Sequence, residues 1–335
     1  MNKRPLSDKL RIKAGKLAGL LLSVLLAALC LAGCGGSGTE EKEERIRIVT
    51  TIFPQYDWVR AILGDDPEGT ELILLQDTSV DLHSFQPAAA DLLAISSCDL
   101  FIYIGGESDE WVENALKDSR NPGRIAISLL DELGGAAKKE ELPEGAGENR
   151  QEEGEESEYD EHIWLSLRNA SLCVKSIADA LCRIDPQHAE TYRSNAQAYQ
   201  EKLRSLDQAY EMAASEGRVS ALLFGDRFPF RYLAEDYGLT CYAAFSGCSA
   251  ETEASFETIL FLAEKTDELG LRAVMTIEGT DHRIAETIVQ NTKTKDQKIL
   301  VMDSMQAVTA KDAGNGTTYL SIMEKNLAVL KEALQ

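Results

Sequence analysis

Two series of short strand-like runs, each interleaved with helix-like stretches, constrain the fold of this chain more than any other feature. Residues 100–104 (LFIYI) illustrate the pattern, because a short apolar run followed by two glycines is typical of a strand in a buried parallel sheet. Strands separated by helices of this length predict parallel βαβ units. The strand-like runs are residues 45–51, 71–75, 100–104 and 124–128, and then 221–224, 240–245, 273–277 and 298–302. The helix-like stretches are residues 56–63, 88–97, 111–117, 167–183, 188–215, 228–237, 252–269, 281–292 and 318–334.

Between the two series, residues 188–215 contain neither glycine nor proline. As a helix this stretch would be a rod of roughly 42 Å, which is longer than one small domain needs. We therefore predict an α/β protein of two lobes, each a mainly parallel sheet flanked by helices, joined by one long rigid helix. The expected boundaries are residues 46–187 for the N-terminal lobe, 188–217 for the linking helix and 218–335 for the C-terminal lobe.

An acidic segment, residues 134–161, interrupts the N-terminal lobe. Between residues 140 and 161, 11 of 22 side chains are acidic, and almost none is apolar. Self-repulsion and the lack of core residues predict a disordered insert. A solvated loop is the simplest interpretation, and a weak role in gathering cations is the alternative.

The first 33 residues have the features of a bacterial signal peptide: six basic residues, then an apolar run at residues 17–31, then small residues before Cys34. About 15 apolar residues fall short of the ~20 that a membrane span needs. The Leu-Ala-Gly-Cys order resembles a lipobox, in which Cys34 becomes the lipidated first residue of the mature chain. Residues 34–45 then act as a flexible tether. We expect an extracytoplasmic protein anchored to the bacterial cell membrane.

The net charge indicates which classes of partner the chain can bind, and the cysteine pattern indicates whether disulfides hold the fold. Removal of residues 1–33 takes away six basic residues and one acidic residue, so the formal net charge goes from −22 to −27. Such a chain suits cations and is a poor match for nucleic acid or an anionic bilayer. The later cysteines are odd in number and form no CxxC motif, so no disulfide scaffold is indicated; Cys241 and Cys248 are either a pair or free buried thiols.

Only four histidines occur, and His83 and His162 lie in short loops just before helix-like segments. Imidazoles at such junctions, with carboxylates nearby, are candidate ligands of zinc, copper, iron or nickel. The other two, His188 and His282, stand where helices begin and are explained as caps or solvated residues.

Several motifs occur in an order that resembles the zinc/manganese-type solute-binding lipoproteins of metal-importing ABC transporters. These are the lipobox, residues 50–54 (TTIFP), 81–87 (DLHSFQP), 105–111 (GGESDEW), 162–165 (HIWL), the long helix, 237–239 (YGL) and 319–326 (YLSIMEKN). The resemblance covers residues 46–335 without the acidic segment. It implies that four side chains, two from each lobe, meet at one ion in the interlobe cleft.

By position, the resemblance implies His83 and His162 as ligands from the N-terminal lobe and Asp303 as the last ligand. The third ligand is a histidine or glutamate in relatives, but residues 224–232 contain no histidine and the spacing is about one residue longer. Asp226 is therefore the candidate. Relatives also carry a glutamate at the position of Glu278. The resemblance therefore implies that the Glu278 side chain positions a metal ligand.

Two imidazoles and two carboxylates would balance the charge of a divalent ion. Zinc accepts such a set as a tetrahedron. Ligand hardness favours manganese slightly, whereas raw affinity favours zinc. We expect a monomeric, non-enzymatic protein that captures Zn²⁺ or Mn²⁺ and delivers it to the membrane permease of an ABC importer, with only small lobe rotations.

One alternative of another class remains at this stage. A site of two histidines and a carboxylate with an open position could activate water, as in a metal-dependent hydrolase. No glycine loop of the GxGxxG or GxxxxGK(S/T) kind stands between a predicted strand and a predicted helix, and GxSxG and HExxH do not occur in the sequence. A secondary role as a surface adhesin also stays open.

Overall fold

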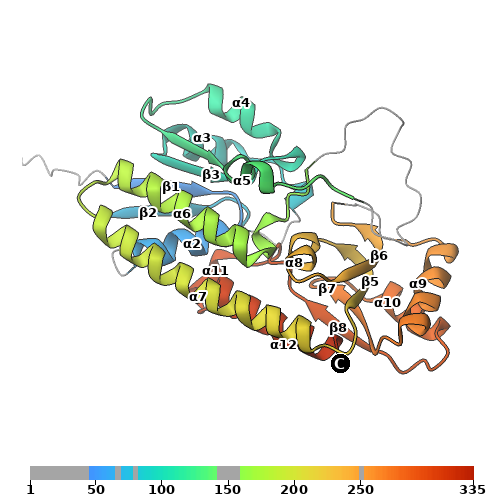
Figure 1. The fold of residues 1–335 in the computed structure, drawn as a ribbon. Coiled ribbons are helices and arrows are strands. Elements are labelled where there is room, and N and C mark those ends of the chain that lie inside the picture. Colours follow the sequence, from blue (N-terminus) through green and yellow to red (C-terminus); the bar gives the residue numbers. More distant parts are fainter. Residues whose placement is uncertain (1–44, 65–68, 78–81, 142–158, 249–252) are drawn as a thin grey trace, which may run out of the picture. The chain divides into compact units, whose positions relative to one another are not determined.

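Two four-stranded parallel sheets carry the fold of the computed structural model, which describes residues 45–64, 69–77, 82–141, 159–248 and 253–335 (Figure 1). Both sheets belong to one unit, Arg45–Gln335. The predictions for the leader, the lipidated Cys34 and most of the tether fall on residues 1–44 and lie outside the described residues. Within the described residues, no helix has the length and apolar character needed to cross a membrane.

The first sheet has the order β2-β1-β3-β4, from β1 (Ile46–Thr50), β2 (Thr70–Leu74), β3 (Leu100–Tyr103) and β4 (Ile125–Ser128). Alternate residues of its strands face different cores, as the two-residue period of a strand requires. Ile48 and Leu100 join the large core, whereas Val49 and Phe101 join a smaller cluster. The accompanying helices are α2 (Phe53–Leu63), α3 (Ala89–Ser97), α4 (Trp111–Lys117), α5 (Leu129–Leu133) and α6 (Leu167–Ile184).

The second sheet has the order β6-β5-β7-β8, from β5 (Ala221–Phe228), β6 (Thr240–Ser246), β7 (Ala273–Ile277) and β8 (Lys298–Met302). Its helices are α8 (Arg231–Asp236), α9 (Phe256–Leu269), α10 (Arg283–Asn291), α11 (Ala310–Gly314) and α12 (Tyr319–Ala333). In both sheets the order reverses once beside the first strand. The carboxyl ends of the strands at such a reversal are where open α/β sheets bind ligands.

The long helix is present as α7 (Ala189–Glu216), within one residue of the predicted stretch at each end. It packs along α6, α2 and α12, so it contacts two helices that accompany the first sheet and the helix that closes the chain (Figure 1). Its buried side chains recur every three or four residues, as an amphipathic helix requires. The Tyr210 hydroxyl donates to the Met323 carbonyl oxygen in α12 at 2.7 Å.

Most predicted element boundaries agree with the structure to within two residues, whereas the starts of α2, α8 and α9 and the end of β5 deviate by three or four. Helix α2 begins at Phe53 because proline is tolerated in a first helical turn. Helix α9 begins at Phe256, four residues later than predicted. Strand β5 continues to Phe228 through a register shift between Phe224 and Arg227, although the sequence predicted an end at Phe224.

Both ends of the acidic segment are structured, so the prediction of disorder is wrong there. Lys139 and Tyr159 form an antiparallel bridge, and the Asp160 amide donates to the Lys138 carbonyl oxygen at 2.8 Å. Asp160 and Glu161 are buried, because hydrogen bonds described below offset the loss of water. Residues 142–158 lie outside the described residues.

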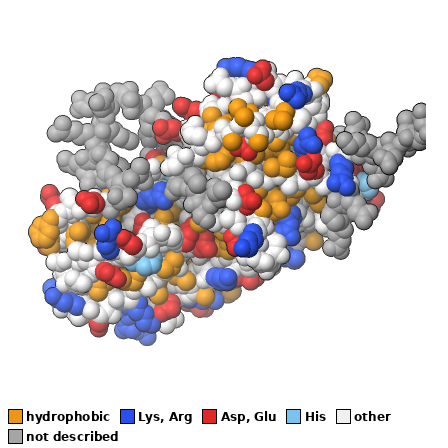
Figure 2. Space-filling view, turned by 180° about the vertical axis from the view of Figure 1, so that it is seen from behind, with side chains coloured by type: hydrophobic (Ala, Val, Ile, Leu, Met, Phe, Trp, Pro, Cys, Tyr) orange, Lys and Arg blue, Asp and Glu red, His pale blue; other side chains and the backbone are white. Residues whose placement is uncertain are grey.

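On the face seen in Figure 2, lysine and arginine side chains are scattered among acidic and hydrophobic ones over the described residues. A protein that binds nucleic acid concentrates basic side chains along one face or stripe.

Candidate metal centre

His83 and His162 lie side by side, although 79 residues separate them in the chain. His83 lies in the short helix η1 (Leu82–Ser84), which the buried Leu82 anchors in the core. His162 immediately precedes η4 (Ile163–Leu165), whose three side chains are all buried. The two Nε2 atoms are 3.4 Å apart and the ring centroids 5.3 Å apart.

This separation fits a shared ion. Two histidine nitrogens that each lie 2.0–2.1 Å from a tetrahedral zinc ion are about 3.3 Å from one another. A direct hydrogen bond between the two rings would be long at 3.4 Å. The geometry therefore suits two ligands that point at one position.

The Nδ1 atoms of both rings are held by other groups. His162 Nδ1 lies 2.9 Å from Asp160 Oδ1, and the His162 amide donates to the same oxygen. His83 Nδ1 lies 2.8 Å from Ser108 Oγ and 3.5 Å from Glu161 Oε2. Such contacts orient metal-binding histidines and place the ring proton on Nδ1, which leaves Nε2 to bind.

Carboxylates give this region a strongly negative environment. Burial alone would lower the pKa of His162, but the hydrogen bond to Asp160 and the nearby acidic charges raise it overall. Burial raises the pKa of Glu161 to about 7, against the hydrogen bonds that its carboxylate accepts from Ser108. Burial likewise raises the pKa of Asp109 to about 6. A divalent cation bound here would favour the ionised carboxylates.

Cys248 completes the group, and sequence reasoning missed it as a ligand. One ligand atom each from His83, His162 and Cys248 lies within 4.8 Å of the other two. Cys248 follows the carboxyl end of β6 and is half-buried. A Cβ atom on Gly247 would lie 3.0 Å from His162 Cε1, so glycine lets the β6 loop approach the imidazole closely.

The signal for Cys248 was its position just after a strand of a parallel sheet, where binding residues gather. The open question of a Cys241–Cys248 pair is answered, since both thiols are free in the structure. Burial and the carboxylates of Glu140, Glu161 and Asp160 raise the pKa of the Cys248 thiol.

The two predicted aspartate ligands are not in this group. Asp226 lies within β5, and its carboxylate accepts hydrogen bonds from the Arg227 amide, the Ile277 amide and the Thr280 hydroxyl. Asp303 follows β8, and its Oδ1 accepts from the Met305 amide at 2.8 Å. Burial and the charge of Glu278 raise the pKa of Asp303 to about 6. Of the four predicted ligands, the structure therefore brings the two histidines together, and the role of the aspartates stays a prediction.

Glu278 reaches the histidines only through intermediates. Its carboxylate accepts hydrogen bonds from the Ser304 amide and hydroxyl and from the Gln306 amide. The Ser304 carbonyl oxygen accepts from Trp164 Nε1 at 2.9 Å, and the Trp164 ring lies against the His162 ring with centroids 5.3 Å apart. Glu278 thus fixes the turn that supports the segment carrying His162.

A cavity of about 510 Å³ opens onto the group. His83 and Cys248 line it, together with Phe85, Gln86, Glu107, Ser108, Glu110, Trp111 and Asn114. His162 is fully buried, so the cavity reaches the group from the side of His83 and Cys248. Two glutamates in the wall give it a charge that suits an approaching cation.

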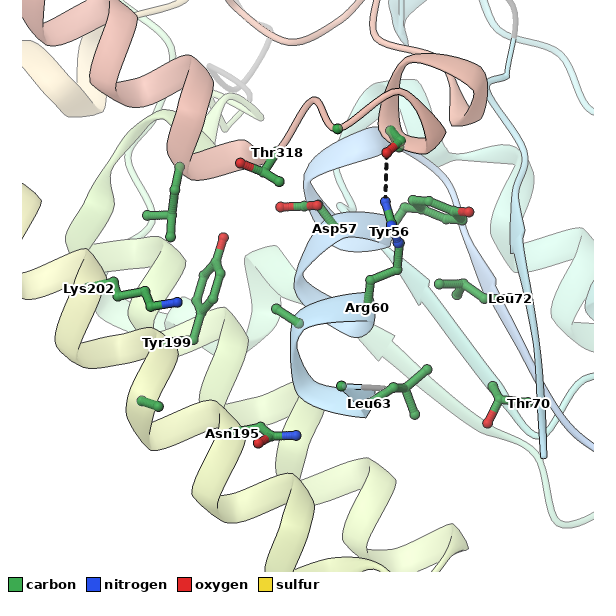
Figure 3. A pocket seen from close by; sticks show the side chains of 16 residues that line it. Tyr56, Asp57, Arg60, Leu63, Thr70, Leu72, Asn195, Tyr199, Lys202 and Thr318 are labelled. Carbon is green, nitrogen blue, oxygen red and sulfur yellow. Dashed lines mark hydrogen bonds between the residues drawn. The ribbon is translucent and has the colours of Figure 1, made fainter. Parts of the chain in front are cut away.

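A second cavity, of about 820 Å³, is lined by none of these residues (Figure 3). Residues of α2, α7 and the segment around α11 line it, and Arg60 donates to the Ala313 carbonyl oxygen across it at 3.1 Å. Asp57 accepts a hydrogen bond from the Tyr319 amide at 2.8 Å. Burial is the main cause that raises the pKa of Asp57 to about 6.

Asp57→Asn is expected to stabilise the protein at pH 8 by about 2 kcal/mol, because the ionised, buried carboxylate costs free energy there. A pKa raised in the folded state favours folding at low pH and loses that contribution as pH rises through about 6. The advantage of the variant should therefore shrink toward pH 4. Urea unfolding at both pH values checks this, with the exposed Asp118→Asn as control. An advantage that is the same at both pH values would contradict the assignment.

Known proteins resemble this chain over most of its length. The chain matches the family model "Zinc-uptake complex component A periplasmic" (ZnuA) over residues 48–333. The zinc-binding lipoprotein AdcA of Streptococcus pneumoniae is 31% identical over 93% of this chain, and the match spans 60% of AdcA. The high-affinity zinc uptake system protein ZnuA of Bacillus subtilis is 28% identical over 95% of this chain and 98% of its own length.

The fold of this chain also matches that of a solved structure. The crystal structure of the Zn(II)-bound ZnuA-like domain of Streptococcus pneumoniae AdcA superposes with a TM-score of 0.66 at 28% identity. It covers 87% of this chain and 99% of that domain. The predicted two-sheet α/β fold and the predicted family are thereby confirmed. This chain belongs to the ZnuA family of zinc-uptake components.

Proposed function

We propose that this protein is an extracytoplasmic solute-binding protein that captures one divalent transition metal ion and delivers it to the permease of an ABC importer. The observation that carries the proposal is the pair of Nε2 atoms 3.4 Å apart, with each Nδ1 held by a carboxylate or hydroxyl. His83 and His162 are the proposed ligands. Asp303 and Asp226 are the carboxylates that the family resemblance adds.

Zinc is the proposed cargo. The two relatives named above are described as zinc-binding or zinc-uptake proteins, and neither name mentions manganese. Two imidazoles also suit zinc better than the harder manganese ion. The preference that ligand hardness gave to manganese rested on two aspartates, which the structure leaves outside the group around the histidines.

Anchoring through a lipidated Cys34, the monomeric state and the permease as partner are parts of the same proposal. A tether of about ten residues would keep the domain close to the membrane. The hydrolase alternative finds no support in the names of these relatives, which describe binding and uptake.

The test is a titration of the purified, metal-stripped protein with Zn²⁺ and Mn²⁺ in competition with a chelator. We expect one tight zinc site, weaker manganese binding, and zinc in protein purified without added metal. His83→Ala should lower zinc affinity at least about 100-fold, since a ligand matters at least as much as the groups that orient it. His188→Ala, at the start of α7, is the matched control and should bind as the wild type does. Wild-type affinity in His83→Ala would overturn the proposal.

A further inference from the structure

We propose that Cys248 is a thiolate ligand of the captured ion, which makes the centre a mixed sulfur–nitrogen site that selects zinc over manganese. This inference rests on the proposed function above and assigns Cys248 the place that sequence resemblance gave to Asp226.

The positions of the three ligand atoms carry the assignment. A thiolate 2.3 Å and an imidazole nitrogen 2.0–2.1 Å from a tetrahedral zinc ion are about 3.6 Å apart. In the structure the three ligand atoms lie within 4.8 Å of one another. Closing on an ion therefore requires movements on the order of 1 Å, which rotation about one side-chain bond of a cysteine supplies.

The places of the three ligands in the fold also support the assignment. His83 and His162 come from segments that follow strands of the first sheet, whereas Cys248 follows β6 of the second sheet. Gly247 permits the close approach, because a Cβ there would meet both His162 and the Phe228 carbonyl oxygen at 3.0 Å. The segment after β6, which contains Gly247 and Cys248, therefore packs closely against the buried imidazole.

Asp226 is poorly placed to compete for this position. Its two oxygens accept three hydrogen bonds, two of which tie β5 to the end of β7. Turning the carboxylate toward an ion would break these bonds in a buried region and leave their donors unsatisfied, which costs free energy.

The chemistry of sulfur then sets the metal preference. Thiolate is a soft ligand that favours zinc, while manganese prefers carboxylate and water oxygens. On binding, the Cys248 S–H bond is lost, a Zn–S bond forms and the proton passes to solvent. Two neutral imidazoles and one thiolate leave one positive charge on the zinc centre. Asp160 and Glu161, which contact the imidazoles, offset that charge.

Cys248 is also accessible, unlike a cysteine that only fills space. It lines the cavity of about 510 Å³ together with His83, whereas Cys173 is buried within the large core. A small packing residue has no need to line a cavity or to lie near two imidazoles.

Cobalt binding to the purified protein tests the assignment, because thiolate ligation of Co²⁺ gives a near-ultraviolet charge-transfer absorption. We expect this absorption in the wild type and its loss in Cys248→Ser. The matched control is Cys241→Ser, because Cys241 lies near the start of β6, at the opposite end of the strand from Cys248, and is also half-buried. Zinc affinity should fall about 10- to 100-fold in Cys248→Ser and stay unchanged in Cys241→Ser. Manganese affinity should change less than threefold in both.

Alkylation of the wild type supplies a second measurement that does not depend on the variant folding. Saturating zinc should slow iodoacetamide modification of Cys248 at least tenfold and leave Cys241 unaffected. Absence of the charge-transfer absorption in the wild type, or equal loss of zinc and manganese affinity in Cys248→Ser, would overturn the inference. If His83→Ala lowers zinc affinity while Cys248→Ser keeps the wild-type affinity, the proposed function stands and only the inference fails. If His83→Ala binds normally, both fail.

Discussion

His162→Ala is expected to abolish tight zinc binding and also to destabilise the metal-free protein. The ring is fully buried, so alanine leaves a cavity beside Trp164. Asp160, 2% exposed, loses the imidazole that its carboxylate contacts at 2.9 Å. Leaving a buried carboxylate without its hydrogen-bond partner costs about 3 kcal/mol. Urea unfolding of the metal-free variant measures this loss, and zinc competition titration should show an affinity at least about 100-fold lower.

His83→Ala separates the two effects. Its side chain is partly exposed at the cavity and contacts Ser108 and Glu161. Truncation should therefore reduce zinc affinity about as much as His162→Ala, while the stability of the metal-free protein changes by about 1 kcal/mol or less. Equal destabilisation by the two substitutions would show that His162 has no special structural role. Unchanged zinc affinity in either variant would argue against a shared ion.

The alternation of strands and helices could be predicted because most elements are strongly patterned, whereas the five-residue helices α5 and α11 were not predicted. Helix α7 was found to within one residue, since 28 residues without glycine or proline leave no other place for an end. Strand β5 was cut short because Gly225-Asp226 looks like a turn in the sequence. In the structure Gly225 lies against α10, where a Cβ would be 2.6 Å from Ala285 Cα. That contact depends on tertiary packing, which local pattern does not contain.

The residues of the candidate site likewise divide into those that the sequence predicted and those that it did not. Both histidines could be chosen because they are rare and precede helices, and the family order reinforced the choice. Asp160 and Glu161 were assigned to a disordered tract because composition averages over neighbours, and it cannot separate two buried carboxylates from exposed ones. Cys248 was weighed as a disulfide partner or as a free buried thiol, and not as a ligand. Its closeness to His162 follows from how the β6 loop meets a segment 86 residues earlier, which no local signal reveals.

The second large effect is expected for Gly106→Ala, which should destabilise the protein by about 3 kcal/mol and weaken zinc binding about tenfold. Gly106 has φ +85° and ψ −166°, a region that side chains other than glycine hardly adopt. An added Cβ would also approach Glu161 Cγ to 2.7 Å. The glutamate would have to turn, which breaks the bond that Glu161 Oε1 accepts from the Ser108 amide at 2.7 Å. Because Glu161 also contacts His83, the imidazole would lose part of its orientation.

Gly270→Ala is the matched control for the backbone part of this effect. Gly270 has φ +64° at the end of α9, and an added Cβ would meet nothing within 4 Å. Its cost should be about 1 kcal/mol, which is the penalty of a left-handed backbone alone. Zinc affinity should not change, since Gly270 borders the end of α9 and not the histidines. Urea unfolding and zinc titration of both variants give the comparison. Equal costs in the two variants would mean that contact with Glu161 contributes nothing, and that Gly106 does not support the metal centre.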